Sequence, residues 1–159
     1  MTIAEDPRQC WGTPHPLFDT LHRRHRFNVD AAANDSNHLL PSYWTQREDG
    51  IAQLADSAND HLRAFLNPPY SHIDPWAEAV LKRFLRGAVT VMLVPAMRTD
   101  RDWFHLVLPY AKIVFVKGRI RFNPAPGITP TSPFETSMLL VFGDKAPAAI
   151  DVNGAVTLG

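Results

Sequence analysis

Cysteine is almost absent from this sequence of 159 residues. The single one, Cys10, has no partner for a disulfide within the chain, so we expect a reducing compartment, the cytoplasm. One cysteine cannot build a zinc site either, and the seven histidines show no ligand spacing beyond His22 and His25. The composition therefore predicts a protein that has no disulfide and binds no metal.

Long apolar runs and an excess of one charge are also missing. The longest apolar run, 88–96, is interrupted by Thr90 and Pro95, so we expect no membrane span. Residues 1–10 carry acids and no apolar core, which is not the pattern of a secretory signal. The 16 lysines and arginines balance 16 aspartates and glutamates, and this neutrality gives no support to strong non-specific DNA binding. A local basic face is still compatible with it.

What the sequence does contain is a series of alternating helical and strand-like segments. Hydrophobic residues make up 45% of the chain, and the length suits one domain, 1–159, with a core over about 11–142. Three helix starts are predicted from capping patterns, at Thr13-Pro14, Asp74-Pro75 and Thr99. The segments with a strand pattern are 27–31, 65–66, 89–94, 113–116, 120–122 and 138–142, and Asn153-Gly154 predicts a hairpin. This order predicts an α/β fold with a mostly parallel sheet and antiparallel C-terminal strands.

The tetrapeptide Asn67-Pro68-Pro69-Tyr70 is the most informative stretch. If a strand precedes it, it lies at the C-terminal edge of the sheet, where open α/β sheets bind ligands. The prolines stiffen the backbone and leave no amide hydrogen, so this segment is rich in acceptors. The Asn67 carboxamide oxygen and the Pro68 carbonyl could both accept from one amino group and direct its lone pair at a methyl donor. Tyr70 offers a flat face for stacking a base. The alternative is a stiff turn that only follows a strand.

Such a tetrapeptide after an apolar strand is similar to the catalytic motif of methyltransferases that act on the amino group of adenine, cytosine or protein glutamine. The wider arrangement resembles the phage and prophage DNA N-6-adenine methyltransferase (Dam) family. The matching stretches keep their order from Trp11 to Phe142, and they are Trp11–Pro14, Val29–Ala33, Asp49–Ile51, Asn67–Tyr70, Pro95–Asp100, Gly118–Phe122 and Ser137–Phe142. The resemblance implies a Rossmann-like methyltransferase fold in the cytoplasm of a bacterial host cell, with S-adenosylmethionine as cofactor. It also implies methyl transfer to N-6 of adenine in DNA, with base flipping.

The resemblance also implies roles for individual residues. Thr13 and Pro14 would border the methionine part of the cofactor. Asp30 and Ala31 would end the first strand beside the cofactor, and Asp49 would accept a hydrogen bond from its adenine amino group. The implied catalytic residues are Asn67, Pro68, Pro69 and Tyr70, and the implied cofactor-binding residues are Thr13, Pro14, Asp30, Ala31, Asp49 and Asn67. Without the resemblance, Asp30 and Asp49 could each be a turn or helix-cap aspartate.

The sequence departs from the methyltransferase pattern around the cofactor. Residues 31–33 are three alanines where a glycine-rich loop is usual, and alanine does not permit positive φ as glycine does. No acid clearly ends a second strand to hold the ribose hydroxyls, and Asp35 and Glu48 are the candidates that we note. We therefore expect an irregular cofactor site.

DNA contacts are expected on a basic rim beside the tetrapeptide. Arg98, Arg119 and Arg121 follow predicted strands and should lie at the same sheet edge as Asn67. The proline-rich stretch 123–133 is predicted to be a long loop that takes part in recognition, or a partly disordered segment. The sequence leaves two rivals open: an amino-methyltransferase that acts on an RNA base or a protein glutamine, and a non-catalytic nucleic-acid-binding relative. It specifies neither a target site nor an oligomeric state.

Overall fold

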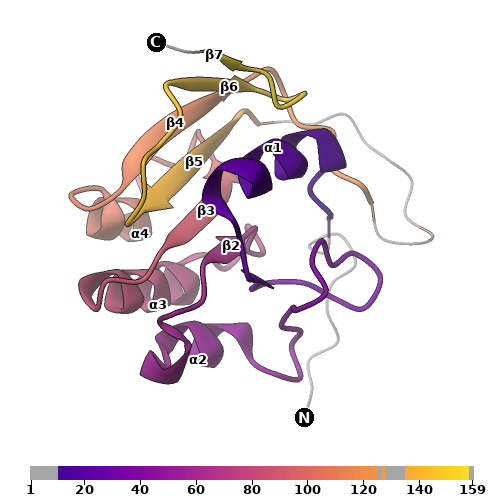
Figure 1. The fold of residues 1–159 in the computed structure, drawn as a ribbon. Helices are drawn as coiled ribbons and strands as arrows, with labels where there is room; N and C mark the ends of the chain where they lie inside the picture. Colours follow the sequence, from indigo (N-terminus) through magenta and orange to yellow (C-terminus); the bar gives the residue numbers. More distant parts are fainter. Residues whose placement is uncertain (1–10, 125–126, 128–134, 158–159) are drawn as a thin grey trace.

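A twisted sheet with helices on both faces forms the framework of the protein (Figure 1). The computed structural model describes residues 11–124, 127 and 135–157. The strands within this part are β1 (Val29–Asp30), β2 (Ala64–Leu66), β3 (Thr90–Pro95), β4 (Lys112–Lys117), β5 (Ser137–Phe142), β6 (Ala149–Asp151) and β7 (Val156–Thr157). The helices are α1 (His15–His25), α2 (Gly50–Ala55), α3 (Asp74–Leu85) and α4 (Asp102–Val107), with a 3-10 turn at Ser57–Asn59. No helix in these ranges is long and apolar enough to cross a membrane.

The strand order is β1-β2-β3-β5-β4-β6-β7. β1, β2 and β3 pair in parallel, and β5 enters antiparallel between β3 and β4. β6 is parallel to β4, and β7 is antiparallel to β6. Five of these seven strands therefore point the same way, while β5 and β7 point the opposite way. This confirms the predicted α/β class with antiparallel strands near the C-terminal end.

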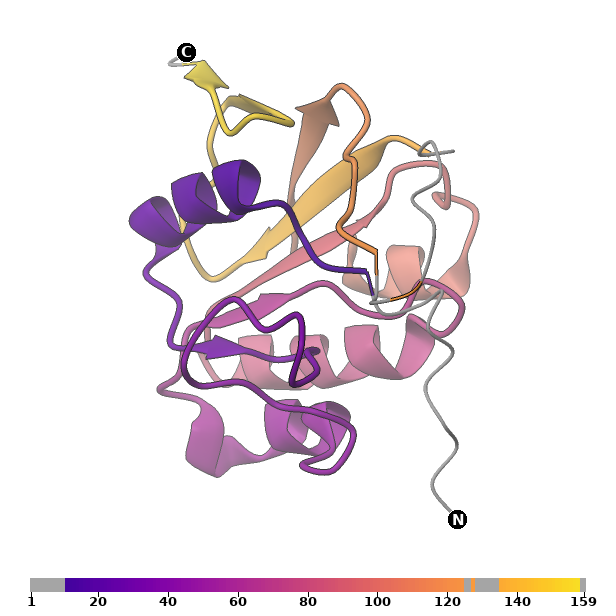
Figure 2. The same cartoon turned by 90° about the vertical axis from the view of Figure 1, so that its right-hand side faces the viewer.

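Two apolar layers hold the sheet between its helices. In Figure 2, α1 lies on one side of the sheet, and α2 and α3 lie on the other. Successive residues of a strand point to opposite faces, so Phe65 packs in the α1 layer while its neighbours Ala64 and Leu66 pack in the other layer. Every residue of β3 and β5 is buried, as expected for strands covered on both faces. The apolar run at 89–94 is thus the central strand that its composition predicted.

Several expectations from local patterns were wrong, two of them at helix starts where tertiary contacts took the place of a side-chain cap. α1 begins without a side-chain cap, since its N-cap is Pro14 and the Thr13 hydroxyl is used elsewhere. α4 also lacks a side-chain cap, and the Thr99 carbonyl lies 2.7 Å from Nε2 of His105 instead. Residues 120–122 form no strand. The weak pattern before β2 concealed α2, which the sequence analysis did not predict.

A buried arginine stabilises the N-terminal ends of β2 and β3, opposite the end that carries the tetrapeptide. Arg83 on α3 is 0% exposed, and its Nη1 donates to the Val89 carbonyl at 2.7 Å and to Oγ1 of Thr90 at 2.6 Å. Its Nη2 donates to the carbonyls of Asn59 and Leu62. One guanidinium therefore joins α3 to the start of β3 and to the turn before β2.

Candidate active site

The tetrapeptide Asn67–Tyr70 directly follows β2 and precedes α3. β2 lies between β1 and β3 and is parallel to both, so the motif occupies the C-terminal edge of the parallel strands. The His72 amide donates to the Pro69 carbonyl at 3.2 Å and closes a turn after the motif. The predicted position of the motif is confirmed, and it is the ligand-binding edge of an open α/β sheet.

The orientation of the Asn67 carboxamide is determined by two acceptors. Its Nδ2 donates to the Trp11 carbonyl at 3.3 Å and to Oγ1 of Thr13 at 3.2 Å. A backbone carbonyl can only accept, so the nitrogen and not the oxygen must face Trp11. Neither contact uses the carboxamide oxygen, which is the atom that the proposed chemistry requires as an acceptor.

The segment that holds Asn67 is itself held by the chain that follows β4. Gly12 and Asn123 form an isolated antiparallel bridge, in which each amide donates to the other carbonyl at 2.8 Å. This bridge lies next in sequence to Trp11 and Thr13, the two partners of Asn67. Phe122, one residue before the bridge, packs edge-to-face on the Tyr70 ring with centroids 6.1 Å apart. The chain after β4 therefore supports the motif at both ends.

Tyr70 is packed more deeply than a simple stacking platform. Its ring packs against the core layer on the α3 side, and its hydroxyl is buried beside Ser137 without a hydrogen bond of ordinary geometry to a described residue. Burial and the nearby Glu135 carboxylate raise the pKa of this hydroxyl. The Tyr70 carbonyl accepts from Nη1 of Arg98 at 2.5 Å. Base stacking on Tyr70 stays a prediction.

Asp30 ends β1 as a buried carboxylate. It is 3% exposed, and its Oδ2 accepts from the Leu39 amide at 3.1 Å. Burial raises the pKa of Asp30 to about 6, although the hydrogen bonds from backbone amides oppose this shift. The side chain thus ties the following loop to the end of β1. The Ala31 side chain beside it is also buried.

Asp49 lies close to this end of β1. A Cβ on the next residue, Gly50, would lie 2.3 Å from the Ala31 carbonyl oxygen, so only glycine allows this approach. Asp49 has φ of 57°, which aspartate tolerates better than most residues, and its Oδ1 accepts from the Ala52 amide at 3.2 Å to cap α2. The structure brings the predicted cofactor residues Asp30, Ala31 and Asp49 together, and it also gives Asp49 the alternative role of a helix cap. The cofactor role stays a prediction.

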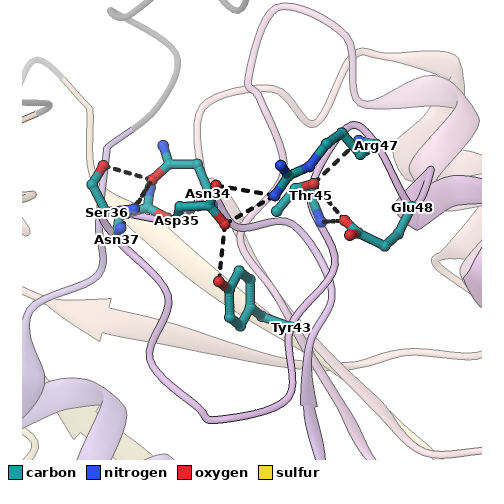
Figure 3. A network of polar contacts seen from close by, with 8 residues as sticks. All are labelled: Asn34, Asp35, Ser36, Asn37, Tyr43, Thr45, Arg47 and Glu48. Atoms are coloured by element: carbon teal, nitrogen blue, oxygen red, sulfur yellow. Dashed lines mark hydrogen bonds and ion pairs between the residues drawn. The ribbon is translucent and has the colours of Figure 1, made fainter.

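A polar loop, and not a further strand, covers the outer side of β1. β1 is the end of the sheet order, and residues 42–44 run along its outer edge, where the Trp44 amide donates to the Asp30 carbonyl at 2.9 Å. Figure 3 shows the network that orders this loop. Its members are Asn34, Asp35, Ser36, Asn37, Tyr43, Thr45, Arg47 and Glu48.

Both acids that were noted for the ribose are engaged in this network. Asp35 accepts from the Tyr43 hydroxyl at 2.9 Å and pairs with Arg47 at 3.0 Å. Glu48 accepts from the Thr45 amide at 2.7 Å and from the Thr45 hydroxyl. The sequence carried a signal for these contacts, because Thr45 and Glu48 have the spacing of a capping box.

A pocket opens between this loop and the segment that holds Asn67. Its volume is about 150 Å³. Its lining residues are Gly12, Thr13, His15, Ser36, Asn37, His38, Leu39, Asn123 and Pro124. Of these residues, Thr13 was predicted for the cofactor site, and Asn123 and Pro124 belong to the stretch predicted to take part in recognition. The lining comes from three segments that only the folded chain brings together. Among the described residues, no group of three or more His, Cys, Asp or Glu could hold a metal ion.

The three arginines of the expected basic rim have different surroundings. Arg98 is committed to contacts within the protein: the Tyr70 carbonyl, and Glu135 at 3.4 Å. Arg119 and Arg121 are exposed and alternate with the more buried Ile120 and Phe122, so both lie on the outer side of the chain after β4. The loop predicted at 123–133 lies largely outside the described residues.

The α/β sheet, mostly parallel with antiparallel strands near its C-terminal end, is consistent with a methyltransferase-like fold. The model of the DNA N-6-adenine-methyltransferase (Dam) family matches residues 2–153, and the chain belongs to this family.

Two curated proteins are similar over part of their length. A DNA N-6-adenine-methyltransferase of Escherichia phage T1 is 28% identical over 98 residues, which are 61% of this chain and 40% of the phage protein. A penicillin-insensitive murein endopeptidase of Citrobacter koseri is 28% identical over 82 residues, which are 52% of this chain and 23% of that protein. The aligned regions thus cover less than half of either relative. The two names differ, and the family match over nearly the whole chain agrees with the first.

Proposed function

We propose that this protein transfers a methyl group to the N-6 amino group of adenine in DNA. The observation that carries the proposal is the orientation of Asn67, whose nitrogen is held by Trp11 and Thr13 so that its oxygen is left to accept from a ligand. Family membership supports this activity, and so does the name of the phage T1 relative.

The motif acts on the amino nitrogen by orientation and electrostatics. The Asn67 oxygen and the Pro68 carbonyl each accept one N–H of the amino group, which turns the nitrogen lone pair out of conjugation with the ring. S-adenosylmethionine, when bound, supplies the electrophilic methyl group. No strong base is needed, because the methylated nitrogen is acidic and loses its extra proton to solvent.

The residues around β1 fit parts of that cofactor. Thr13 lines the polar pocket, and Asp49 presents an exposed carboxylate of which only one oxygen is used by the cap of α2. A pocket of about 150 Å³ is smaller than the 300–1,000 Å³ usual for a small-molecule site, so it would hold only one end of the molecule. Thr13 and Pro14 would border the methionine part, and Asp49 would accept from the adenine amino group. Asp30 and Ala31 would support the cofactor site from inside the protein, since both side chains are buried.

DNA would approach the sheet edge that carries the motif. An adenine within a duplex cannot reach Asn67 while it is stacked, so the enzyme flips the base or acts on single strands. Arg119 and Arg121 are the exposed cations that we assign to phosphate contacts there. Their segment also supports Asn67 and Tyr70 through the Gly12–Asn123 bridge and Phe122, so DNA would bind to the chain that holds the site.

The test is methyl transfer with cofactor labelled in the methyl group. The purified protein is incubated with adenine-containing duplex, single-stranded DNA, RNA and protein, and the products are digested to nucleosides or amino acids. Label in N6-methyl-deoxyadenosine supports the proposal. Label found only in RNA or in glutamine would show that the substrate is not DNA. Cofactor binding by calorimetry without any methyl transfer would favour the non-catalytic relative.

A further inference from the structure

Arg98 connects the end of the tetrapeptide to two other elements. Its Nη1 donates to the Tyr70 carbonyl at 2.5 Å, and its Nη2 lies 3.4 Å from Oε2 of Glu135, just before β5. The Arg98 side chain is 30% exposed and that of Glu135 is 34% exposed, so the ion pair itself adds little. The hydrogen bond to the Tyr70 carbonyl is the shorter of the two contacts, and its charged donor makes it stronger than a hydrogen bond between neutral groups.

Tyr70 is the residue of the motif that most needs an external support. The prolines fix φ at positions 68 and 69, and a following proline restricts Asn67 and Pro68 as well. Tyr70 has neither restriction, and its hydroxyl makes no hydrogen bond of ordinary geometry to a described residue. Among the described contacts, Phe122 therefore holds the ring, and Arg98 holds the carbonyl of the same residue.

The backbone around Arg98 is well placed to act as a fixed support. Just before it, the Ala96 amide donates to the Thr136 carbonyl at 2.8 Å and continues the pairing of β3 with β5. Just after it, the Thr99 carbonyl lies 2.7 Å from Nε2 of His105 on α4. The arginine thus extends from a segment that is anchored on both sides.

We propose that Arg98 is a positioning residue of the methyl-transfer site, which fixes the Tyr70 peptide and thereby the ring, and that it is not a phosphate contact. This inference rests on the proposed function. A phosphate would have to share the guanidinium with the Tyr70 carbonyl and would meet the negative charge of Glu135. Misplacing a reacting group by about 1 Å can cost about 10²-fold in rate, so an orienting contact of this kind matters for turnover.

Arg98→Lys separates the two roles, because it keeps the positive charge and loses the paired geometry of the guanidinium. We expect kcat to fall at least about tenfold, with KM for DNA within about twofold and an unchanged salt dependence of DNA binding. Lys82→Ala, which removes an exposed charge from α3, is the control and should match the unaltered protein. If instead Arg98→Ala raises KM for DNA with kcat intact, and Arg98→Lys restores it, Arg98 is a phosphate contact and the inference is wrong.

A second measurement does not depend on activity. The chain has three tyrosines, so selective ¹³C-tyrosine labelling gives few ring signals, and Tyr70→Phe identifies those of Tyr70. In Arg98→Lys the Tyr70 signals should shift or broaden, while those of Tyr43 and Tyr110 stay in place. Unmoved Tyr70 signals would overturn the role of Arg98 whatever the substrate is. Absence of adenine methylation by the unaltered protein would overturn the proposed function, and the labelling result would still report on the contact.

Discussion

Thr13 illustrates how the surroundings of one side chain decide between two uses. Its position before Pro14 favours a helix cap, yet α1 begins without one, and the hydroxyl accepts from Nδ2 of Asn67 at 3.2 Å. Thr13 is 1% exposed, and a buried polar group without a partner costs about 1–3 kcal/mol. The first turn of α1 has fewer amide groups that need a cap, because Pro16 has no amide hydrogen. The hydroxyl therefore serves the site.

The first prediction concerns turnover. Asn67→Ala should lower kcat at least about tenfold, with a much smaller change in cofactor affinity, because it removes an acceptor that acts on the amino group. Thr13→Val should lower kcat less, since it removes one of two partners of Nδ2, and Thr13→Ser should retain activity. Single-turnover methyl transfer and calorimetry measure the two quantities. Near-normal turnover of Asn67→Ala would contradict the acceptor role.

The second prediction follows from the pKa of Asp30, which burial raises to about 6 from 3.8. The folded state then binds a proton that the unfolded state releases, so stability falls as pH rises through this interval. Each pKa unit corresponds to about 1.4 kcal/mol, and the whole shift to about 3 kcal/mol. Asp30→Asn should be more stable than the unaltered protein above pH 6, and this advantage should vanish near pH 4. Urea unfolding across this range measures it, and a pH-independent difference would contradict the assignment.

At the scale of elements, α2 combines a structural and a proposed functional role. Asp49 uses one carboxylate oxygen to cap the helix, and Gly50 brings the helix start against the end of β1. A carboxylate has a second oxygen for a ligand, whereas an asparagine that caps the helix with its oxygen can offer only an amino group. The short helix thus becomes a means of placing one acceptor beside β1.

Asp49→Asn tests this division. The variant keeps the cap and tolerates the left-handed backbone, so its stability should change little. Its affinity for S-adenosylmethionine should weaken by about 1–3 kcal/mol, because the adenine amino group would then face another donor. Thermal unfolding and calorimetry check the two parts. Unchanged affinity in the folded variant would mean that the cofactor lies elsewhere.

The attachment of α3 to the sheet gives a prediction on stability. Arg83→Met removes four hydrogen bonds, although the Val89 and Asn59 carbonyls still accept from backbone amides, and it should cost at least about 2 kcal/mol of unfolding free energy. Arg86→Met is the matched control from the same helix end, where the ion pair with Asp60 is partly exposed, and it should cost less than Arg83→Met. Equal losses in the two variants would show that the buried contacts of Arg83 are not decisive.

At the scale of the whole molecule, charge is balanced and has to be concentrated locally. With a formal net charge of +0 at pH 7, the protein exerts no long-range attraction on DNA. Any phosphate contacts must then come from a few exposed cations at the motif edge, and Arg98 is occupied by Tyr70 and Glu135. Arg119 and Arg121 are exposed on the segment whose Phe122 packs on Tyr70, and we propose these two arginines as the rim.

The expected consequence is a shallow salt dependence of DNA binding. The slope of log affinity against log salt should be about 2–5, since each phosphate contact contributes close to one unit. Arg119→Ala and Arg121→Ala should each lower it by about one and weaken two unrelated duplexes alike, while Lys82→Ala should not change it. Fluorescence anisotropy across a salt series measures this. Weakening of only one duplex would assign the arginine to base recognition.

The sequence alone determined those features that depend on local patterns. The apolar run at 89–94 became β3, the tetrapeptide followed a strand, and Gly154 has the positive φ that the predicted hairpin turn requires. Periodicity, stiff prolines and permissive glycines act over a few residues, so they can be recognised without knowledge of the fold. The apolar pattern at 120–122 wrongly predicted a strand. Ile120 is buried, as the pattern requires, but the segment pairs with no strand among the described residues.

Only the tertiary structure decided which distant groups meet. Asn67 and Thr13 are 54 positions apart, and Arg98 and Tyr70 are 28 apart, and nothing in either local pattern specifies these pairs. The choice of partner follows from burial: a polar group removed from water must use whatever donor or acceptor the fold brings within reach. For the same reason Asp30, which the sequence shows as an ordinary aspartate, has a pKa near 6 at the end of β1.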